Sequence, residues 1–251
     1  MTDRRHFLRN TLLALGGATL AGCDRISESE TGARVLESAE AVTRRVQRFL
    51  SPSRALAKEY AESDISPVFK PNGTTMPDTP LYQSLLRGEF SDYRLEVDGL
   101  VARPARLSLE ELKALGSRTQ ITRHDCVEGW SAIGKWTGTP LAAVLDRVGP
   151  TDRARYVVFH CFDTYDEDTP YYESIDLDEA RHPQTLLAHT LNDKPLPVAN
   201  GAPLRLRVER QLGYKHAKYL RRIEIVASFA DIGEGNGGYW EDNGYEWYAG
   251  I

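Results

Sequence analysis

The first residue whose type and setting suggest chemistry is Cys126. It stands in residues 122–130 (TRHDCVEGW), where a predicted strand runs into a loop that contains glycine and tryptophan. A thiolate is the reactive and metal-binding form of cysteine, and a cationic neighbour such as Arg123 favours that form. Loops that leave rigid strands commonly carry catalytic groups. The pattern indicates a reactive or metal-binding thiol, although a buried structural cysteine fits it equally well.

A second set of residues combines glycine-rich turns with basic side chains. Residues 200–205 (NGAPLR) end in Arg205, and residues 213–218 (GYKHAK) end in Lys218. Glycine lets a backbone approach a ligand closely, and a basic residue at the end of such a turn suits a phosphate. Taken alone, these segments fit surface turns with solvated charges as well as a binding site.

Composition restricts the classes of protein that fit these residues. The chain has 251 residues, of which 41% are hydrophobic and 27% charged, as in globular proteins. Its 31 basic and 36 acidic residues give a net charge of -5, which argues against a nucleic-acid partner. The cysteines Cys23, Cys126 and Cys161 are too few for a disulfide scaffold.

Strands and helices that could position these residues alternate along the chain. Ser108 and Glu111 form a capping box that predicts a helix start, and Pro140 opens a second helix that ends near Gly149. The expected fold is α+β, a single mixed-sheet domain preceded by a helical extension. The predicted strands are residues 93–101, 119–123, 156–159, 204–208 and 219–227.

Residues 1–22 have the pattern of a targeting segment. Arg4 and Arg5 precede an apolar run that is too short to span a membrane, and residues 20–23 (LAGC) follow. The paired arginines look like a twin-arginine export signal, and the ending looks like a lipoprotein processing site. We expect a periplasmic protein that is attached to the membrane only through lipidated Cys23. An ordinary secretory signal with an incidental cysteine is the alternative.

Residues 23–66 are expected to form a lipid-anchored tether and an amphipathic helix. Apolar residues recur at helical spacing between positions 35 and 49, with basic residues among them. The helix is expected to pack on the body of the protein, with a partner or a membrane surface as the alternative. Residues 67–251 are expected to form the main domain.

Three segments occur together in a fixed order: residues 126–131 (CVEGWS), 136–141 (WTGTPL) and 200–205. Together they resemble the sulfite oxidase family of molybdopterin-dependent oxidoreductases, over residues 93–226. The most similar subgroup is the bacterial periplasmic one that includes the catalytic subunit of a methionine-sulfoxide reductase system. The resemblance implies that residues 67–251 form a molybdopterin-binding oxidoreductase domain.

The resemblance also assigns the metal and the cofactor contacts. It implies that Cys126 supplies a thiolate to molybdenum, a soft donor for a redox metal, and that Arg123 holds an anionic substrate or tunes the thiolate. Cys161 falls where the subgroup has a hydroxyl residue near the cofactor. The implied contacts to the pterin and its phosphate are Asn72, Asn200, Arg205, His216, Ala217 and Lys218.

The activity implied by the resemblance is the transfer of an oxygen atom to or from a small sulfur-containing substrate, of the sulfite or sulfoxide type. The sequence has no haem-attachment motif, so we expect a separate electron-transfer protein, either a haem protein or a quinone-linked one. We also expect no dimerisation domain of the kind that follows the catalytic domain in full sulfite oxidases.

Three alternatives use the same residues differently. A zinc or copper site is possible if His124, Asp125 and Cys126 meet His160 and Cys161. A disulfide between Cys126 and Cys161 is permitted outside the cytoplasm if the geometry allows it. A cofactor-binding scaffold without catalysis is the third alternative.

Overall fold

The structure is a computed structural model, and it describes residues 55–165 and 169–251. These residues belong to one compact unit, Ser53–Ile251. The predicted signal peptide, Cys23 and the predicted amphipathic helix lie outside the described residues. Within the described ranges, no helix has the length and apolar character needed to cross a membrane.

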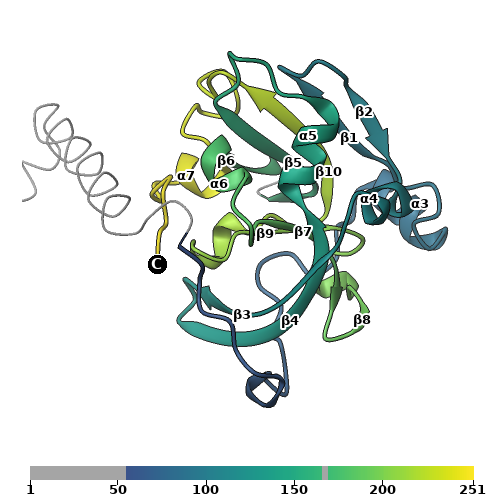
Figure 1. Cartoon of the computed structure of the whole chain (residues 1–251), viewed down its shortest axis with the longest axis vertical. Helices are drawn as coiled ribbons and strands as arrows, with labels where there is room; N and C mark the ends of the chain where they lie inside the picture. The colour runs from purple at the N-terminus through teal and green to yellow at the C-terminus, as the bar shows by residue number, and fades with distance from the viewer. Residues whose placement is uncertain (1–54, 166–168) are drawn as a thin grey trace, which may run out of the picture. The chain divides into compact units, whose positions relative to one another are not determined.

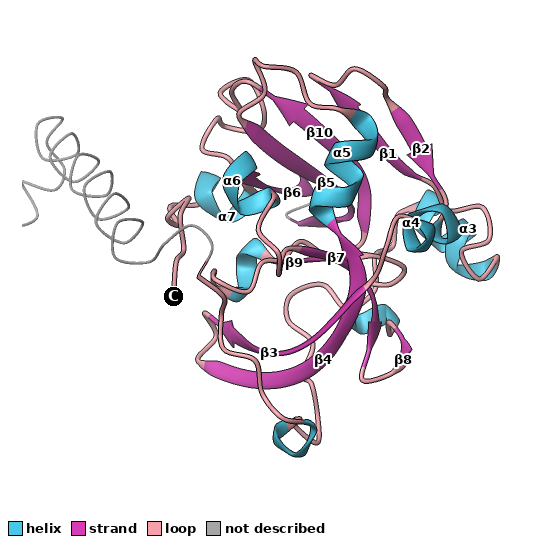
Figure 2. Ribbon diagram, viewed as in Figure 1, coloured by secondary structure: helices cyan, strands magenta, loops and turns pink. Residues whose placement is uncertain are grey.

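One of the two sheets is mixed, with five strands in the order β2-β1-β10-β5-β6 (Figure 2). Strands β1 and β10 run parallel, and the other neighbours are antiparallel. Buried and exposed residues alternate in β1, as expected where one face covers a core. The strands are β1 (Leu95–Gly99), β2 (Ala105–Leu107), β5 (Tyr156–Tyr165), β6 (Thr169–Asp176) and β10 (Leu220–Val226).

The second sheet is antiparallel and is built on a long hairpin of β3 and β4, the curved ribbon in Figure 1. Strand β4 also pairs with β7, which in turn pairs with β8 and β9. Part of the expected tether joins this sheet, since the Tyr60 N–H donates to the Ile121 carbonyl at 2.9 Å. The strands are β3 (Arg118–Cys126), β4 (Trp130–Pro140), β7 (Leu186–Leu191), β8 (Lys194–Pro195) and β9 (Arg205–Arg207).

Short helices connect the strands. Ser108 Oγ accepts the Glu111 N–H at 3.1 Å and Glu111 accepts the Ser108 N–H at 2.8 Å, which confirms the predicted capping box. Pro140 precedes the next helix, and left-handed Gly149 ends it, also as predicted. The helices are α3 (Pro80–Arg87), α4 (Leu109–Ala114), α5 (Leu141–Val148), α6 (Leu177–Ala180) and α7 (Tyr239–Asp242), with 3-10 turns η1 (Glu62–Asp64), η3 (Val198–Asn200) and η4 (Gly213–Lys215).

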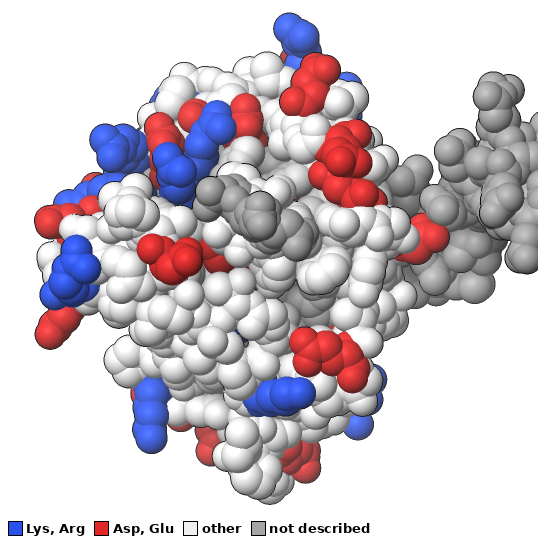
Figure 3. Space-filling model, turned by 180° about the vertical axis from the view of Figure 1, so that it is seen from behind, with Lys and Arg blue, Asp and Glu red and all other residues white. Residues whose placement is uncertain are grey.

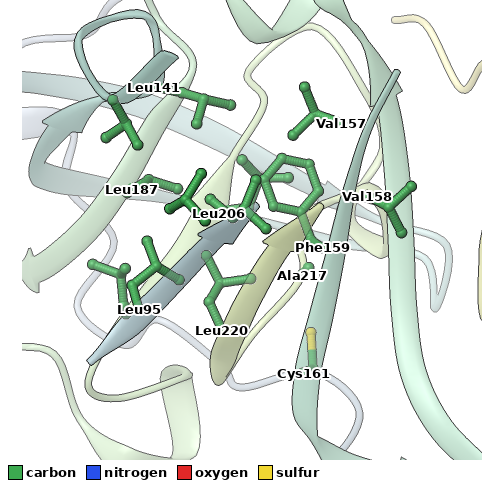
Figure 4. Packing of buried hydrophobic residues seen from close by; sticks show 14 of the residues in the cluster. Leu95, Leu141, Val157, Val158, Phe159, Cys161, Leu187, Leu206, Ala217 and Leu220 are labelled. Atoms are coloured by element: carbon green, nitrogen blue, oxygen red, sulfur yellow. The ribbon is translucent and has the colours of Figure 1, made fainter. Parts of the chain in front are cut away.

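Side chains from both sheets share one hydrophobic core. Phe159 and Leu220 of the mixed sheet pack in the same cluster as Leu187 and Leu206 of the antiparallel sheet (Figure 4). Each is fully buried, and burying a side chain of this size contributes about 1.5–3 kcal/mol. A smaller cluster surrounds Trp136. The shared core holds the sheets together, so residues from both can meet at one site.

The α+β class with a mixed sheet is confirmed, but the domain contains a second sheet that the sequence patterns did not predict. That sheet depends on β4 and β7, whose residues do not alternate clearly between polar and apolar types. On the face shown in Figure 3, basic and acidic side chains are interspersed, with broad areas that carry neither. This face lacks the basic stripe that binding to phosphate backbones requires.

Candidate functional site

The hairpin of β3 and β4 places Cys126 at its tip. Cys126 ends β3 and pairs with Trp130, the first residue of β4. Three residues form the turn, and Gly129 there has φ +86°, a left-handed conformation that suits glycine. Side chains alternate along β3, so Cys126 lies on the same buried face as Thr122 and His124.

Cys126 opens into a pocket whose walls come from distant parts of the chain. Four predicted site residues line it: Asn72, Cys126, His216 and Lys218. The antiparallel hairpin contributes one wall, and the segment that leads into β10 of the mixed sheet contributes another. The other lining residues are Gly73, Val127, Glu128, Asp163, Tyr165, Tyr171, Gly213, Tyr214, Trp240 and Tyr245.

Residues 213–218 reach the hairpin because their first residue is glycine. A Cβ atom at Gly213 would lie 2.6 Å from His124 Nε2, closer than side-chain atoms approach one another. The ring of His216 is fixed by the backbone on both sides: Nε2 lies 3.0 Å from the Gln211 carbonyl, and Nδ1 accepts the Val208 N–H at 3.4 Å. Burial lowers the pKa of His216 well below its ordinary value, so the imidazole is neutral.

Arg205 connects the two predicted binding turns. Its guanidinium donates to the Asn200 carbonyl at 3.0 Å and to the His216 carbonyl at 3.2 Å. It is fully buried and stands 5.1 Å from the ring centroid of Trp136, a cation–π contact. Burial, with the nearby charge of Arg207, lowers the pKa of Arg205 to about 9. Arg205 therefore joins the turn at residues 200–205 to the turn at residues 213–218, and its guanidinium places a buried positive charge beside both.

Lys218 ties the N-terminal loop to the same turns. Its ammonium donates to the backbone carbonyls of Asn72 at 2.5 Å and Ala199 at 3.1 Å, and also to that of Thr74. Burial lowers the pKa of Lys218 to about 7, with Arg205 adding to the effect. An anionic group in the pocket would favour the charged form of this lysine.

Buried polar atoms without a hydrogen-bond partner show what kind of ligand would fit. Most buried polar groups in folded proteins are paired, and an unpaired one costs about 1–3 kcal/mol. A ligand that carries both donors and acceptors, with an anionic end toward Arg205 and Lys218, would satisfy atoms of both types. Among the unpaired atoms of the described residues, Asn72 Oδ1 and Asp163 Oδ1 belong to residues that line the pocket, and His124 Nε2, Asn200 Nδ2 and Arg205 Nε belong to residues behind the lining. The donor set therefore fits a pterin cofactor with a phosphate end.

Two of the predicted cofactor contacts lie in the core. Cys161 and Ala217 belong to the main hydrophobic cluster, among the residues labelled in Figure 4. Cys161 lies on β5 opposite Leu220 of β10, and the Ala217 carbonyl accepts the Leu206 N–H at 2.8 Å. Like Asn200 and Arg205, neither is a lining residue of the pocket, so the structure places all four behind its wall.

The structure separates Arg123 from the site. Arg123 lies on the face of β3 opposite Cys126, half-exposed, with Nε 2.9 Å from a carboxylate oxygen of Asp125. The expectation that Arg123 holds substrate or favours the thiolate is therefore corrected, because alternating side chains point away from each other. Burial instead raises the pKa of the Cys126 thiol above its ordinary value of 9.0.

The alternative uses of the cysteines are not supported. Over residues 55–165 and 169–251, no three His, Cys, Asp or Glu side chains are grouped so as to hold a metal ion. Cys126 on β3 and Cys161 on β5 are both free thiols, and their strands belong to different sheets. Neither the zinc or copper site nor the disulfide is therefore formed.

Several lining residues were not predicted from the sequence. Asp163 follows Cys161 by two positions on β5, which was the only signal that could have identified it. Trp240 and Tyr245 come from the aromatic segment near the end of the sequence. Glu128 lies within the CVEGWS segment and accepts the Trp130 indole N–H at 2.9 Å.

Comparison with known proteins defines the class to which this fold and site belong. Residues 83–231 match the family model described as the oxidoreductase molybdopterin binding domain. The matched range contains Cys126, Asn200, Arg205, His216 and Lys218. The chain belongs to this family and is an oxidoreductase of the molybdopterin-binding type.

Three similar relatives are named for methionine sulfoxide. The putative protein-methionine-sulfoxide reductase subunit YedZ1 of Azospira oryzae is 38% identical over 98% of this chain and 87% of its own length. The protein-methionine-sulfoxide reductase catalytic subunits MsrP of Xanthomonas campestris and Xanthomonas axonopodis are each 43% identical over 55% of this chain. The match covers 46% of each MsrP protein, about half its length.

Proposed function

We propose that this protein is a molybdopterin-dependent enzyme that removes the oxygen atom from sulfoxides of the methionine sulfoxide type. The observation that carries the proposal is the opening of the Cys126 thiol into a pocket lined by Asn72, His216 and Lys218. The names of the relatives supply the substrate type, and the pocket supplies a place for a cofactor and a small polar group.

Each assigned residue has a defined task in this proposal. Cys126 would hold the metal through sulfur, while Asn72 and Asn200 present unpaired amide atoms to the pterin. Arg205 and Lys218 place positive charge where the phosphate would lie, and such charge-assisted hydrogen bonds are the stronger ones. When bound, the cofactor supplies a redox metal that exchanges an oxygen atom with the substrate.

The mouth of the pocket suits a substrate that is polar at one end and apolar at the other. Val127 and Tyr245 line the pocket and are 45% and 40% exposed, so they present apolar surface to the entrance. Lys70 Nζ lies 3.5 Å from Glu128 and 5.4 Å from the ring centroid of Trp130. A sulfoxide combines a polar S–O group with apolar carbon arms, which fits such a rim.

The cellular setting of the proposal comes from the N-terminal segment. We propose that a twin-arginine signal exports the folded protein to the periplasm and that lipidated Cys23 attaches it to the membrane. We also propose that a separate haem protein or quinone-linked protein supplies the electrons. Removing an oxygen atom as water needs two electrons and two protons, so the reaction requires such a donor.

Turnover with an artificial electron donor tests the proposal. We expect reduced viologen to be oxidised when methionine sulfoxide is added to the purified protein, and to stay reduced with Cys126→Ser. If the protein instead oxidised sulfite with an artificial electron acceptor and reduced no sulfoxide, it would add an oxygen atom to its substrate and not remove one. Turnover of neither substrate by a protein that carries the cofactor would contradict the proposal.

A further inference from the structure

Asp163 is a buried acid in the pocket wall, and the proposed function assigns no task to it. It lies on β5, is 2% exposed, and lines the pocket with Asn72 and Lys218. Its Oδ1 atom has no hydrogen-bond partner among the described residues. A buried acceptor without a partner is costly, so the folded chain keeps it there at the expense of stability.

The nearest cation does not satisfy this oxygen. Lys218 acts on Asp163 through its charge, but its three ammonium protons are used by the carbonyls of Asn72, Thr74 and Ala199. Asp163 is therefore close to a positive charge without forming an ion pair with it. Asp163 lines the pocket, so a ligand held there is a candidate partner for this unpaired oxygen.

The chemistry of the cofactor restricts what could occupy that space. A phosphate and a dithiolene are anionic groups that accept hydrogen bonds, and a buried carboxylate repels them. The pterin ring is the part of the cofactor that carries N–H donors, on its amino group and ring nitrogens. Arg205 and Lys218 suit the phosphate, whereas Asp163 complements a group that donates.

We propose that Asp163 is a further cofactor-binding residue, whose carboxylate accepts hydrogen bonds from the N–H groups of the pterin ring. This inference rests on the proposed function, because it needs the same cofactor in the same pocket. It assigns the donor-bearing ring of the cofactor to the side of the pocket that β5 forms.

The ionisation of Asp163 is consistent with this role. Burial raises the pKa of Asp163 to about 7 in the protein without a ligand, so its carboxyl is partly protonated at neutral pH. Hydrogen bonds donated to a carboxylate favour the ionised form. Loading the cofactor should therefore lower this pKa.

Two forms of the protein test the proposal, one made in ordinary cells and one made in cells that cannot synthesise the pterin. In Asp163→Asn, we expect the pterin content of the loaded form, measured by fluorescence after release, to fall about tenfold or more. The melting-temperature difference between loaded and cofactor-free forms should shrink, because a weaker ligand stabilises less. The cofactor-free variant should melt no lower than the cofactor-free wild type, because it no longer buries an unpaired acid.

Asp242→Asn is the matched control. Asp242 accepts hydrogen bonds from Tyr172 Oη at 2.6 Å and from the Glu234 N–H at 3.0 Å, and it does not line the pocket around Cys126. This variant should lower both melting temperatures alike and keep the pterin content. A structural role for Asp163 would produce the same pattern as the control.

The outcomes separate this inference from the proposed function. Wild-type pterin content and an unchanged melting difference in Asp163→Asn would overturn the inference while leaving the proposed function intact. Equal losses of stability in both forms would also overturn it. A wild-type protein that carries no pterin would overturn both proposals together.

Discussion

Cys126 and Lys218 line one pocket, although Cys126 ends a strand of the antiparallel sheet and Lys218 precedes β10 of the mixed sheet. The segment of residues 213–218 makes this possible because it crosses from β9 to β10 and passes against the tip of the hairpin. A sulfur atom and a buried cation thus reach one pocket because the two sheets meet there.

Replacing the Cys126 sulfur should abolish activity without unfolding the protein. In Cys126→Ser, we expect reductase activity to fall below detection, because a hydroxyl is a poor substitute for a thiolate toward a redox metal. The side chain is small and sits at a hairpin tip, so the free energy of unfolding should change by about 1 kcal/mol or less. Steady-state assays and chemical denaturation measure the two effects, and retained turnover would contradict the role of Cys126.

Removing the Arg123 side chain should have almost no effect. Its guanidinium is half-exposed and pairs with Asp125 on the face of β3 opposite the pocket. Exposed ion pairs contribute about 0–1 kcal/mol, so Arg123→Ala should change stability by no more than that. We expect kcat/KM for the sulfoxide to stay within about twofold of wild type. A tenfold loss would show that Arg123 acts on the substrate after all.

The contrast between these residues shows what the sequence could and could not predict about the site. Cys126, Arg205 and Lys218 were identified because their segments occur together in one family. Arg123 was wrongly assigned to the site because its closeness to Cys126 in the sequence does not show where its side chain points. Adjacent residues of a strand point to opposite faces. Asp163 was missed because neither its burial nor its free oxygen is visible in the local sequence.

In the fold, too, some elements could be predicted from the sequence and others could not. The capping box at Ser108 predicted its helix because the signal is local. Strand β4 was not predicted because Gly134 and Gly138 break the apolar pattern. The structure explains Gly138: a Cβ atom there would lie 2.4 Å from the Leu187 carbonyl oxygen of the neighbouring strand. A requirement set by a distant strand cannot be found by examining one segment.

The buried Lys215 should be essential for stability. It is fully buried and forms ion pairs with Glu173 and Glu241, which anchor η4 to β6 and α7. Removing one partner from a buried ionic group typically costs about 3–5 kcal/mol because the remaining charges are left uncompensated. We expect Lys215→Met to lose that much free energy of unfolding in denaturant titrations. The exposed control Lys194→Met should lose less than about 0.5 kcal/mol.

The same ionic group should affect how stability depends on pH. Burial, with the charge of Glu241, raises the pKa of Glu173 well above its ordinary value of 4.5. Above pH 4.5 the folded protein then binds more protons than the unfolded chain. The free energy of unfolding therefore falls as pH rises. Glutamine cannot titrate, so Glu173→Gln should become steadily more stable relative to wild type as pH rises above the ordinary value of 4.5. Parallel stability curves would show that Glu173 keeps an ordinary pKa.

The most direct test is the amount of molybdenum and pterin in the purified wild-type protein. Elemental analysis and pterin fluorescence of protein from molybdenum-replete cells should give one metal ion and one pterin per chain. Cys126→Ser should keep the pterin and lose turnover, since the dithiolene also binds the metal and the Cys126 thiolate is the assigned protein ligand. Wild-type protein without either component would contradict the assignment of the pocket as a molybdopterin site.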